Sequence, residues 1–235
     1  FDDRSWTVRY LVVDTGTWLN SRKVLISPSA LGVAEWDKRV LPVALTQDQV
    51  RLSPPLDPAE PVTQEHENQL THYYNWPAYW GPAGFPDMGY AMPMVPVDVE
   101  PPQPAGVPVA PARRVSAENA VHPAPHHVRS VRAVTGYAIA AKDGALGHVD
   151  DFLIDDRSWE IRYLVVDTRN FLPGKKVIVA PQWIQSVGWE DAKVSVDLAR
   201  ETIKSSPEYD PEQVLTPDYA GQLHDHYGRA RYDAW

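Results

Sequence analysis

The chain has 235 residues, of which 43% are hydrophobic, with a formal net charge of −9 and a sequence pI near 5.3. This size suits one large or two small domains, and the acidic balance argues against binding to nucleic acid or to an anionic bilayer, since both need a basic surface. The absence of cysteine excludes disulfides and thiolate metal sites, and no apolar run approaches the roughly 20 residues of a membrane-spanning helix.

One segment of 14 residues occurs twice, 153 positions apart. Residues 2–15 read DDRSWTVRYLVVDT and residues 155–168 read DDRSWEIRYLVVDT, so the copies differ at two positions. We therefore expect two copies of one domain, and we call residues 153 positions apart counterparts. The same offset aligns the following sequence without a gap, as in the counterparts Pro28 and Pro181, Trp36 and Trp189, and Thr63 and Thr216.

Short strands are expected in the first copy. Apolar residues alternate over residues 6–13, which predicts a well-buried β-strand. Residues 23–26 predict the next strand, and Pro28 ends it because proline lacks the N–H that a sheet ladder needs. A short strand or turn at 31–36 and an alternating strand at 40–45 follow, and the proline within the latter indicates an edge strand.

Helices are expected near the end of each copy. Residues 46–50 suit a short helical turn, and Thr63 is expected to accept a hydrogen bond from the first turn of a helix at 64–74. In the second copy, Thr216 takes the cap position and Pro217 the first helical position, where its missing N–H costs nothing.

Proline dominates the segment between the copies. Residues 81–129 contain 11 prolines and show little periodicity. Such a composition buries too little apolar surface to offset chain entropy, so we expect an extended, disordered linker. The chain is thereby divided into a first domain at 1–80, the linker at 81–129 and a second domain at 130–235.

The second copy is complete at its front. Residues 135–140 and 146–154 predict two strands joined by an Asp-Gly turn, with Gly147 as a β-bulge. Residues 134–153 have no counterpart in the first copy, which suggests an N-terminal truncation of about 20 residues. Loss of this strand pair is expected to expose strand edges, which are a pairing and aggregation hazard. In the alternative, the other copy or a second chain covers these edges.

These motifs resemble the PRC-barrel family, named after the cytoplasmic domain of the photosynthetic reaction-centre H subunit. The resemblance rests on GYAIAAKDGALGHVDDFLIDD, RYLVVD and KVIVAP, in that order; it covers residues 134–200 well and residues 1–47 as a shortened copy. It implies a mainly β fold of two small antiparallel barrels of about six strands, each followed by a short C-terminal helix and joined by the proline-rich linker.

The resemblance also implies candidate acidic positions. In the reaction-centre subunit, acids at the turn before the RYLVVD strand assist proton delivery to a quinone in a partner subunit, and Asp3 and Asp156 match one of them. Trp6 and Trp159 stand where a second acid is expected, which puts this function in doubt. A related barrel forms part of a bacterial 16S rRNA maturation factor, whose separate RNA-side domain has no equivalent in this sequence.

Acidic pairs are the first candidates for chemistry, and a structural role is favoured for them. General acid–base catalysis needs two carboxylates in different environments, whereas the adjacent aspartates at 2–3 and 155–156 are typical of turns that bind their own backbone. His224 and His226 point to different faces of a helix. We expect solvated histidines at these two positions and at His72, and in the linker at His122, His126 and His127.

No catalytic residue, metal site or cofactor is therefore expected, and a hydrolase or metal enzyme using Asp156 and the histidines is the least favoured hypothesis. Aromatic tails are the best interaction candidates, because Tyr and Trp give large contact areas at low entropic cost. An equally weighted alternative folds these rings back onto the barrels. The candidates are Trp76, Tyr79, Trp80, Tyr232 and Trp235.

The leading functional prediction is a non-enzymatic protein-interaction or scaffold module, which binds a protein partner or itself through the barrel surface. One alternative is an accessory subunit of a reaction-centre-like electron-transfer complex, and another is a binding module like the ribosome maturation factor. The cytoplasm is the expected location, with membrane association through a partner or through a segment ahead of Phe1 as the alternative.

Overall fold

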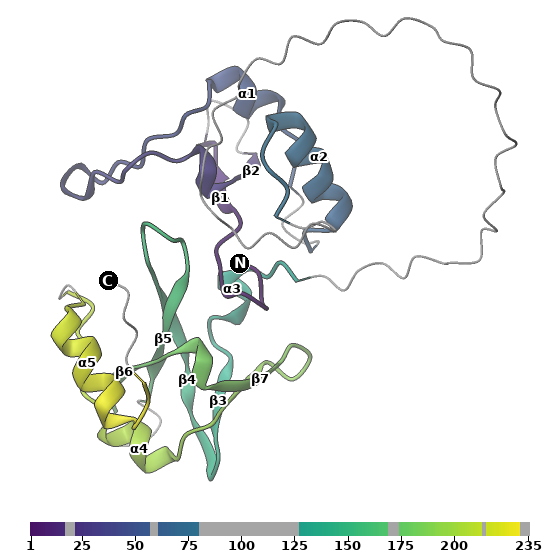
Figure 1. Cartoon of the computed structure of the whole chain (residues 1–235). Coiled ribbons are helices and arrows are strands. Elements are labelled where there is room, and N and C mark those ends of the chain that lie inside the picture. Colours follow the sequence, from purple (N-terminus) through teal and green to yellow (C-terminus); the bar gives the residue numbers. More distant parts are fainter. Residues whose placement is uncertain (17–21, 57–60, 80–126, 169–173, 213–214, 231–235) are drawn as a thin grey trace, which may run out of the picture.

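The computed structural model describes residues 1–16, 22–56, 61–79, 127–168, 174–212 and 215–230 (Figure 1). The expected linker at 81–129 lies outside the described residues, apart from its last three. Within the described residues the fold is mainly β, as predicted, with a six-stranded mixed sheet in the second copy and a two-stranded sheet in the first.

The second copy is built on a sheet with the strand order β6-β5-β4-β3-β8-β7. Its strands are β3 (Ala138–Ala141), β4 (Gly144–Ile154), β5 (Ile161–Asp167), β6 (Lys176–Val179), β7 (Ile184–Gly188) and β8 (Lys193–Val196). All neighbours are antiparallel except β3 and β8, which run parallel with Ile139 opposite Val194. The expectation of a purely antiparallel sheet is therefore wrong at this pairing, because strand periodicity in a sequence does not encode the partner of a strand.

The expected closed barrel is not found among the described residues. β6 and β7 are the outer strands of the sheet, and no ladder joins them. They are nevertheless consecutive in the chain and are separated only by the short 3-10 helix η4 (Pro181–Trp183). Chain connectivity, not hydrogen bonding, therefore links the two edges.

A β-bulge in β4 shapes the core of the second copy. Ala138 pairs with His148 and Ala140 pairs with Ala145, so β4 carries one residue more than β3 between these two pairs. Gly147 lies in this stretch of β4. Gly147 has a φ of +63°, and an added Cβ would come 1.9 Å from the carbonyl oxygen of Asp167. Only glycine fits so close an approach of two backbones, and the predicted bulge is confirmed.

Apolar side chains from the strands fill one core in the second copy. Its most completely buried residues include Leu146, Val149, Val166, Val177, Ile178 and Val194. Phe1 and Val8, which precede the first strand of the first copy, are buried in the same cluster. The start of the first copy is thus part of the core of the second.

The first copy has a smaller core. β1 (Leu11–Asp14) and β2 (Lys23–Ile26) form a two-stranded antiparallel sheet, and the buried cluster beneath them consists of Val24, Ile26 and Ala30. The helical elements of this copy are η2 (Pro28–Ala30), η3 (Trp36–Lys38), α1 (Gln47–Leu52) and α2 (Gln64–Tyr74).

Two strand predictions for the first copy are wrong in part. The first strand begins at Leu11, because residues 2–7 form a turn closed by the bridge between Asp2 and Thr7. Residues 31–43 form a hairpin held by isolated bridges between Leu31 and Val43 and between Glu35 and Val40, not a continuous strand. This hairpin, between β2 and α1, projects away from the rest of the first copy (Figure 1).

The predicted helix caps are confirmed in both copies. The Thr63 hydroxyl accepts a hydrogen bond from the His66 amide at 3.1 Å, and the Thr216 hydroxyl accepts one from the Tyr219 amide at 3.2 Å. The helices of the second copy are α3 (Val131–Val134), α4 (Arg200–Ser205) and α5 (Pro217–His226), with Pro217 in the first turn of α5.

The gapless offset of 153 residues holds at the level of single hydrogen bonds. The Thr15 amide donates to the Arg22 carbonyl at 3.0 Å, and its counterpart Thr168 donates to the Lys175 carbonyl at 3.0 Å. Both threonine hydroxyls donate to the same carbonyls at 2.8 Å. The two copies therefore share local geometry as well as sequence.

Candidate protein-interaction surface

The two copies pair with each other through equivalent residues. The Val8 amide donates to the Trp159 carbonyl at 2.8 Å, and the Ile161 amide donates to the Trp6 carbonyl at 2.7 Å. Trp159 and Ile161 are the counterparts of Trp6 and Val8, so the two hydrogen bonds are the same bond made in both directions. Thr7 lies opposite its own counterpart Glu160. The junction therefore has the geometry of a local two-fold axis between these two residues.

The turn that precedes this pairing is the same in both copies. One Asp2 carboxylate oxygen accepts hydrogen bonds from the amides at positions 4 and 5, and one Asp155 oxygen accepts them from positions 157 and 158, all at 2.9–3.0 Å. Trp6 and Trp159 both adopt left-handed backbone, with φ of 54° and 58°. The aspartates thus act as turn formers, as the sequence suggested, and they orient the self-complementary segment.

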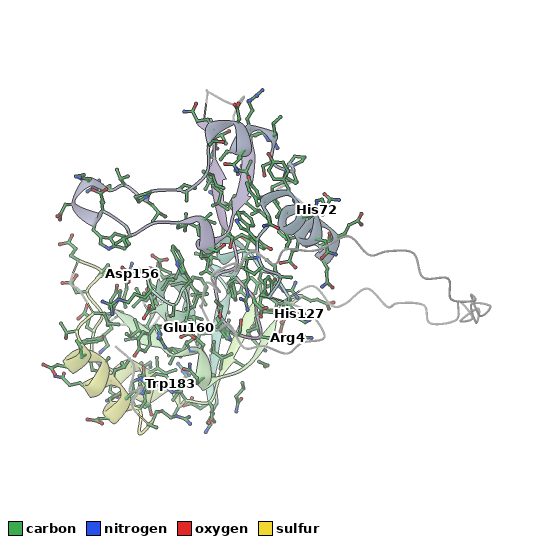
Figure 2. The ribbon with its side chains drawn as sticks, turned by 45° about the horizontal axis from the view of Figure 1, so that its top comes forward. Arg4, His72, His127, Asp156, Glu160 and Trp183 are labelled. Carbon is green, nitrogen blue, oxygen red and sulfur yellow. The ribbon has the colours of Figure 1, made fainter. Side chains whose placement is uncertain are left out.

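Asp3 and Asp156, the two acidic positions implied by the family resemblance, have different surroundings. Asp3 is almost buried at the junction, with His127 Nδ1 at 3.1 Å and Arg129 Nε at 3.0 Å from its carboxylate oxygens. Asp156 is exposed. Figure 2 marks His127 near the junction and Asp156 on the second copy. Asp3 therefore joins the start of the first copy to the segment that leads into the second.

The outer edge of β1 has no strand partner among the described residues. In the second copy, β4 pairs with the corresponding edge of β5, and β3 pairs with β8. The counterparts of residues 134–153, which supply β3 and most of β4, would fall ahead of Phe1. Side-chain exposure records the difference: Val12 on β1 is 57% exposed, whereas its counterpart Val165 is 2% exposed.

The hairpin at 31–43 shows the same contrast. Val43 is 38% exposed against 1% for Val196. Trp36 is 72% exposed, whereas its counterpart Trp189 is half-buried beside Tyr137 and beneath the Arg129 guanidinium, 4.3 Å from its ring. We call β1 together with the 31–43 hairpin the open face of the first copy.

Three further exposed apolar residues belong to the first copy alone. Val33, Val40 and Leu52 are 89%, 48% and 62% exposed. Their counterparts, which are also exposed, are Ser186, Lys193 and Ser205. The first copy thus carries apolar side chains where the second carries polar ones, and clusters of exposed apolar residues are typical of protein-interaction surfaces.

The aromatic tail of the first copy folds back, as one of the two predicted alternatives required. The Trp76 ring stacks on Tyr74 with centroids 4.2 Å apart and packs against the small core. The Tyr79 hydroxyl donates to Glu67 Oε1 at 2.5 Å, and the Arg9 guanidinium lies 3.9 Å above the Tyr79 ring. The other interaction candidates, Trp80, Tyr232 and Trp235, lie outside the described residues.

Glu67 is a buried acid that the sequence analysis missed. It is 6% exposed in α2, and its counterpart in the second copy is Ala220. Burial raises the pKa of Glu67, while hydrogen bonds from the Tyr79 and Tyr10 hydroxyls lower it in part. Burial is also the largest cause of the raised pKa of Tyr79. This cluster ties α2 to the strand segment that begins the first copy.

Replacing Glu67 by Gln is expected to make the first copy less sensitive to pH. A carboxyl whose pKa is raised by folding contributes stability below its unfolded pKa of about 4.3, and that contribution is lost as pH rises through the folded value. Gln keeps an acceptor for Tyr79 and cannot ionise. The melting temperature of the native chain should therefore fall relative to the Glu67→Gln variant as the pH rises from about 4 through the raised pKa of Glu67, measured by calorimetry. The exposed Glu65→Gln variant should follow the native chain; identical pH profiles for all three chains would contradict the assignment.

Three of the histidines expected to be solvated depart from that expectation. His127 pairs with Asp3, and His226 Nε2 lies 2.8 Å from the Thr202 carbonyl oxygen. His224, expected to be solvated, is 2% exposed; its Nε2 lies 3.3 Å from the Tyr163 hydroxyl, and its Nδ1 lies 2.6 Å from the Ala230 carbonyl oxygen. The chain beyond α5 folds back over this ring, which a helical periodicity does not reveal. His72 is exposed on α2, as expected (Figure 2).

One cluster in the second copy has the residue types of a cation site. The ligand atoms of His148, Asp150 and Asp167 lie within 4.8 Å of one another. The Lys176 ammonium sits 2.7 Å from Asp150 Oδ2 and already supplies a positive charge there.

Two surface hollows of about 680 and 380 Å³ are lined by neither Asp156 nor any histidine.

Within the described part of the chain, no helix combines the length and the apolar character needed to cross a membrane.

No family model and no curated protein matches the sequence. Among solved structures, the chain is similar to one described as the 16S ribosomal RNA processing protein RimM from Pseudomonas aeruginosa, with 14% identity and a TM-score of 0.25. The match covers 31% of this chain and 45% of that one, so the chain spans less than half of the structure that it matches.

Proposed function

We propose that this chain is a non-enzymatic protein-interaction module built from two PRC-barrel-type copies, in which the second copy anchors the first and the first binds a protein partner. The proposal rests on one observation. Counterpart residues that are buried in the second copy, or polar there, are exposed and apolar on the open face of the first. The contrast between Val12 at 57% and Val165 at 2% exposure is the largest example within the repeated segment.

The anchoring role follows from the junction. Phe1 and Val8 are buried in the core of the second copy, and the reciprocal backbone pairing fixes the orientation of the segment that leads into β1. The open face is thereby presented by a rigid support. Unpaired strand edges are natural templates for pairing with another chain, and many peptide-recognition domains use this mode of binding.

A protein suits this face better than a nucleic acid. The chain carries a net charge of −9, and phosphate backbones require cationic contacts. Exposed Val and Trp side chains instead offer apolar area, and Trp is enriched among the residues that dominate binding energy. The reaction-centre and ribosome-factor alternatives stay predictions, and so does a location in the cytoplasm.

Photocrosslinking with matched positions tests the proposal. A photoreactive amino acid at Trp36 or Val33 is expected to give a discrete protein adduct in the native host. The same group at the counterparts Trp189 and Ser186, on the second copy, should not give that adduct. Equal labelling from both copies, or none from either, would remove the support for a binding role of the open face.

A further inference from the structure

We propose that the second copy binds a divalent transition-metal ion such as Zn²⁺ between β4 and β5, with His148, Asp150 and Asp167 as its ligands. This site is separate from the open face and does not rest on the proposed function. The sequence gave no signal for it, because the three residues come from two strands and meet only in the folded sheet.

The register of the sheet brings the imidazole and one carboxylate together. His148 on β4 is the cross-strand neighbour of Asp167, the last residue of β5. Asp167 is fully buried, with 0% exposure, whereas His148 and Asp150 are half-buried. Burial of an ionised carboxylate is costly unless positive charge and hydrogen bonds compensate for it. A cation held between these residues therefore stabilises the place where β4 meets β5.

β4 departs from regular strand geometry on both sides of the histidine. The bulge at Gly147 comes directly before His148. The register with β5 then shifts between Val149 and Asp151, so that Asp150 is one extra residue on β4. Bulges re-aim side chains and are common beside functional sites. In the resulting arrangement, one ligand atom from each of the three residues lies within 4.8 Å of the other two.

These donors suit a transition-metal ion in type and spacing. Zinc binds imidazole nitrogen and carboxylate oxygen at about 2.1 Å, which places two ligands of a tetrahedral ion about 3.4 Å apart. The three atoms therefore need to approach one another by about 1.4 Å at most, which side-chain rotation can supply. Calcium instead takes oxygen ligands alone, and more of them. Three protein ligands leave the fourth position of a zinc ion to water.

The Lys176 ammonium is the group that a metal ion must displace, since it lies 2.7 Å from Asp150 Oδ2. Its side chain is 33% exposed and lines the neighbouring hollow of about 680 Å³. The other charged residues that line this hollow are Glu208, Asp210 and Asp218. A displaced ammonium thus has space to turn into and further carboxylates to face. Lys176 and the metal ion therefore compete for the same carboxylate.

Calorimetric titration of Zn²⁺ into the full chain tests the site. Loss of one ligand, in His148→Gln or in Asp167→Asn, should weaken zinc binding by about 100-fold or more. Lys176→Met removes the competing ammonium and should strengthen it by about tenfold. The matched control is Asp14→Asn, at the exposed counterpart of Asp167, which should leave the affinity unchanged.

A gain of affinity in Lys176→Met cannot come from misfolding, so the test is decisive even if Asp167→Asn fails to fold. Zinc binding that is unchanged in His148→Gln would place the ion at other histidines and overturn the inference. A native chain that binds no zinc would overturn it as well. So would a Lys176→Met variant that binds zinc no more tightly than the native chain, since the ammonium would then not compete with the ion.

Paramagnetic Co²⁺ locates the ion independently. In NMR spectra of the native chain, substoichiometric Co²⁺ should shift or broaden the amide signals of residues 147–151 and 166–168 before those of the first copy. Lys176→Met should show the same pattern at lower Co²⁺ concentration. Signals that change first at other positions would contradict the assignment of these three ligands.

Discussion

A negative charge at position 165 is expected to unfold the second copy, whereas the same charge at position 12 is tolerated. Val165 is 2% exposed in β5 and Val12 is 57% exposed in β1, although both occupy the same place in an identical RYLVVD segment. An unpaired carboxylate in the core leaves a buried charge without compensation, and Val165→Asp should cost about 4 kcal/mol or more of unfolding free energy. Val12→Asp changes a solvated side chain and should cost less than about 0.5 kcal/mol.

Chemical denaturation of the full chain measures both values. The comparison is controlled internally, because the substitution and the flanking sequence are the same while the burial of the substituted side chain differs. Similar losses at the two positions would mean that the outer edge of β1 is covered in solution. The same Val12→Asp variant should also weaken the photoadduct at Trp36, because Val12 and Trp36 both belong to the open face.

The local features of the fold were predictable because their causes are local. Thr63 and Thr216 cap helices through hydrogen bonds to amides three residues ahead, and Gly147 sits in a bulge that only glycine fits. The offset of 153 residues carried these assignments from one copy to the other. The turn-forming role of Asp2 and Asp155 was likewise contained in the DDRSW motif.

The features that were not predicted depend on contacts between distant segments. Residues 40–45 have the alternation of a strand, but among the described residues only isolated bridges pair them, because no described segment takes the place of β3. The parallel pairing of β3 with β8 likewise depends on contacts between distant segments. So does the burial of His224, whose ring contacts the Ala230 carbonyl oxygen.

The candidate site was predicted only in outline. The sequence indicated that strand edges of the first copy would be exposed, but it pointed to aromatic tails as the contact residues. Trp76 and Tyr79 instead pack onto their own copy, while Trp36 and Val33 are the exposed side chains. The signal was present in the alignment of the copies, since Val33, Val40 and Leu52 replace Ser186, Lys193 and Ser205. The reciprocal pairing at Thr7 and Glu160 had no signal beyond the identity of the two segments.

An engineered disulfide is expected to form between positions 7 and 160 and to stabilise the junction strongly. Thr7 and Glu160 face each other in an antiparallel bridge flanked by the hydrogen bonds of their neighbours. This is a non-hydrogen-bonded pair, for which the Cα separation is about 4.5 Å, within the range of about 4.4–6.8 Å that disulfides span. Closing a loop of this length stabilises a chain by about 5 kcal/mol in the entropic description.

The most direct test of the reciprocal pairing is therefore the oxidation of the Thr7→Cys/Glu160→Cys variant, since the native chain contains no cysteine. We expect an intramolecular disulfide that forms readily in the folded monomer, seen as a loss of two free thiols at unchanged mass on non-reducing gels. A control variant with Thr7→Cys and Glu201→Cys, on the distant helix α4 (Figure 1), should keep both thiols free. Thiols that stay reduced in the first variant, or that link only between chains, would show that the two copies do not pair through their equivalent segments.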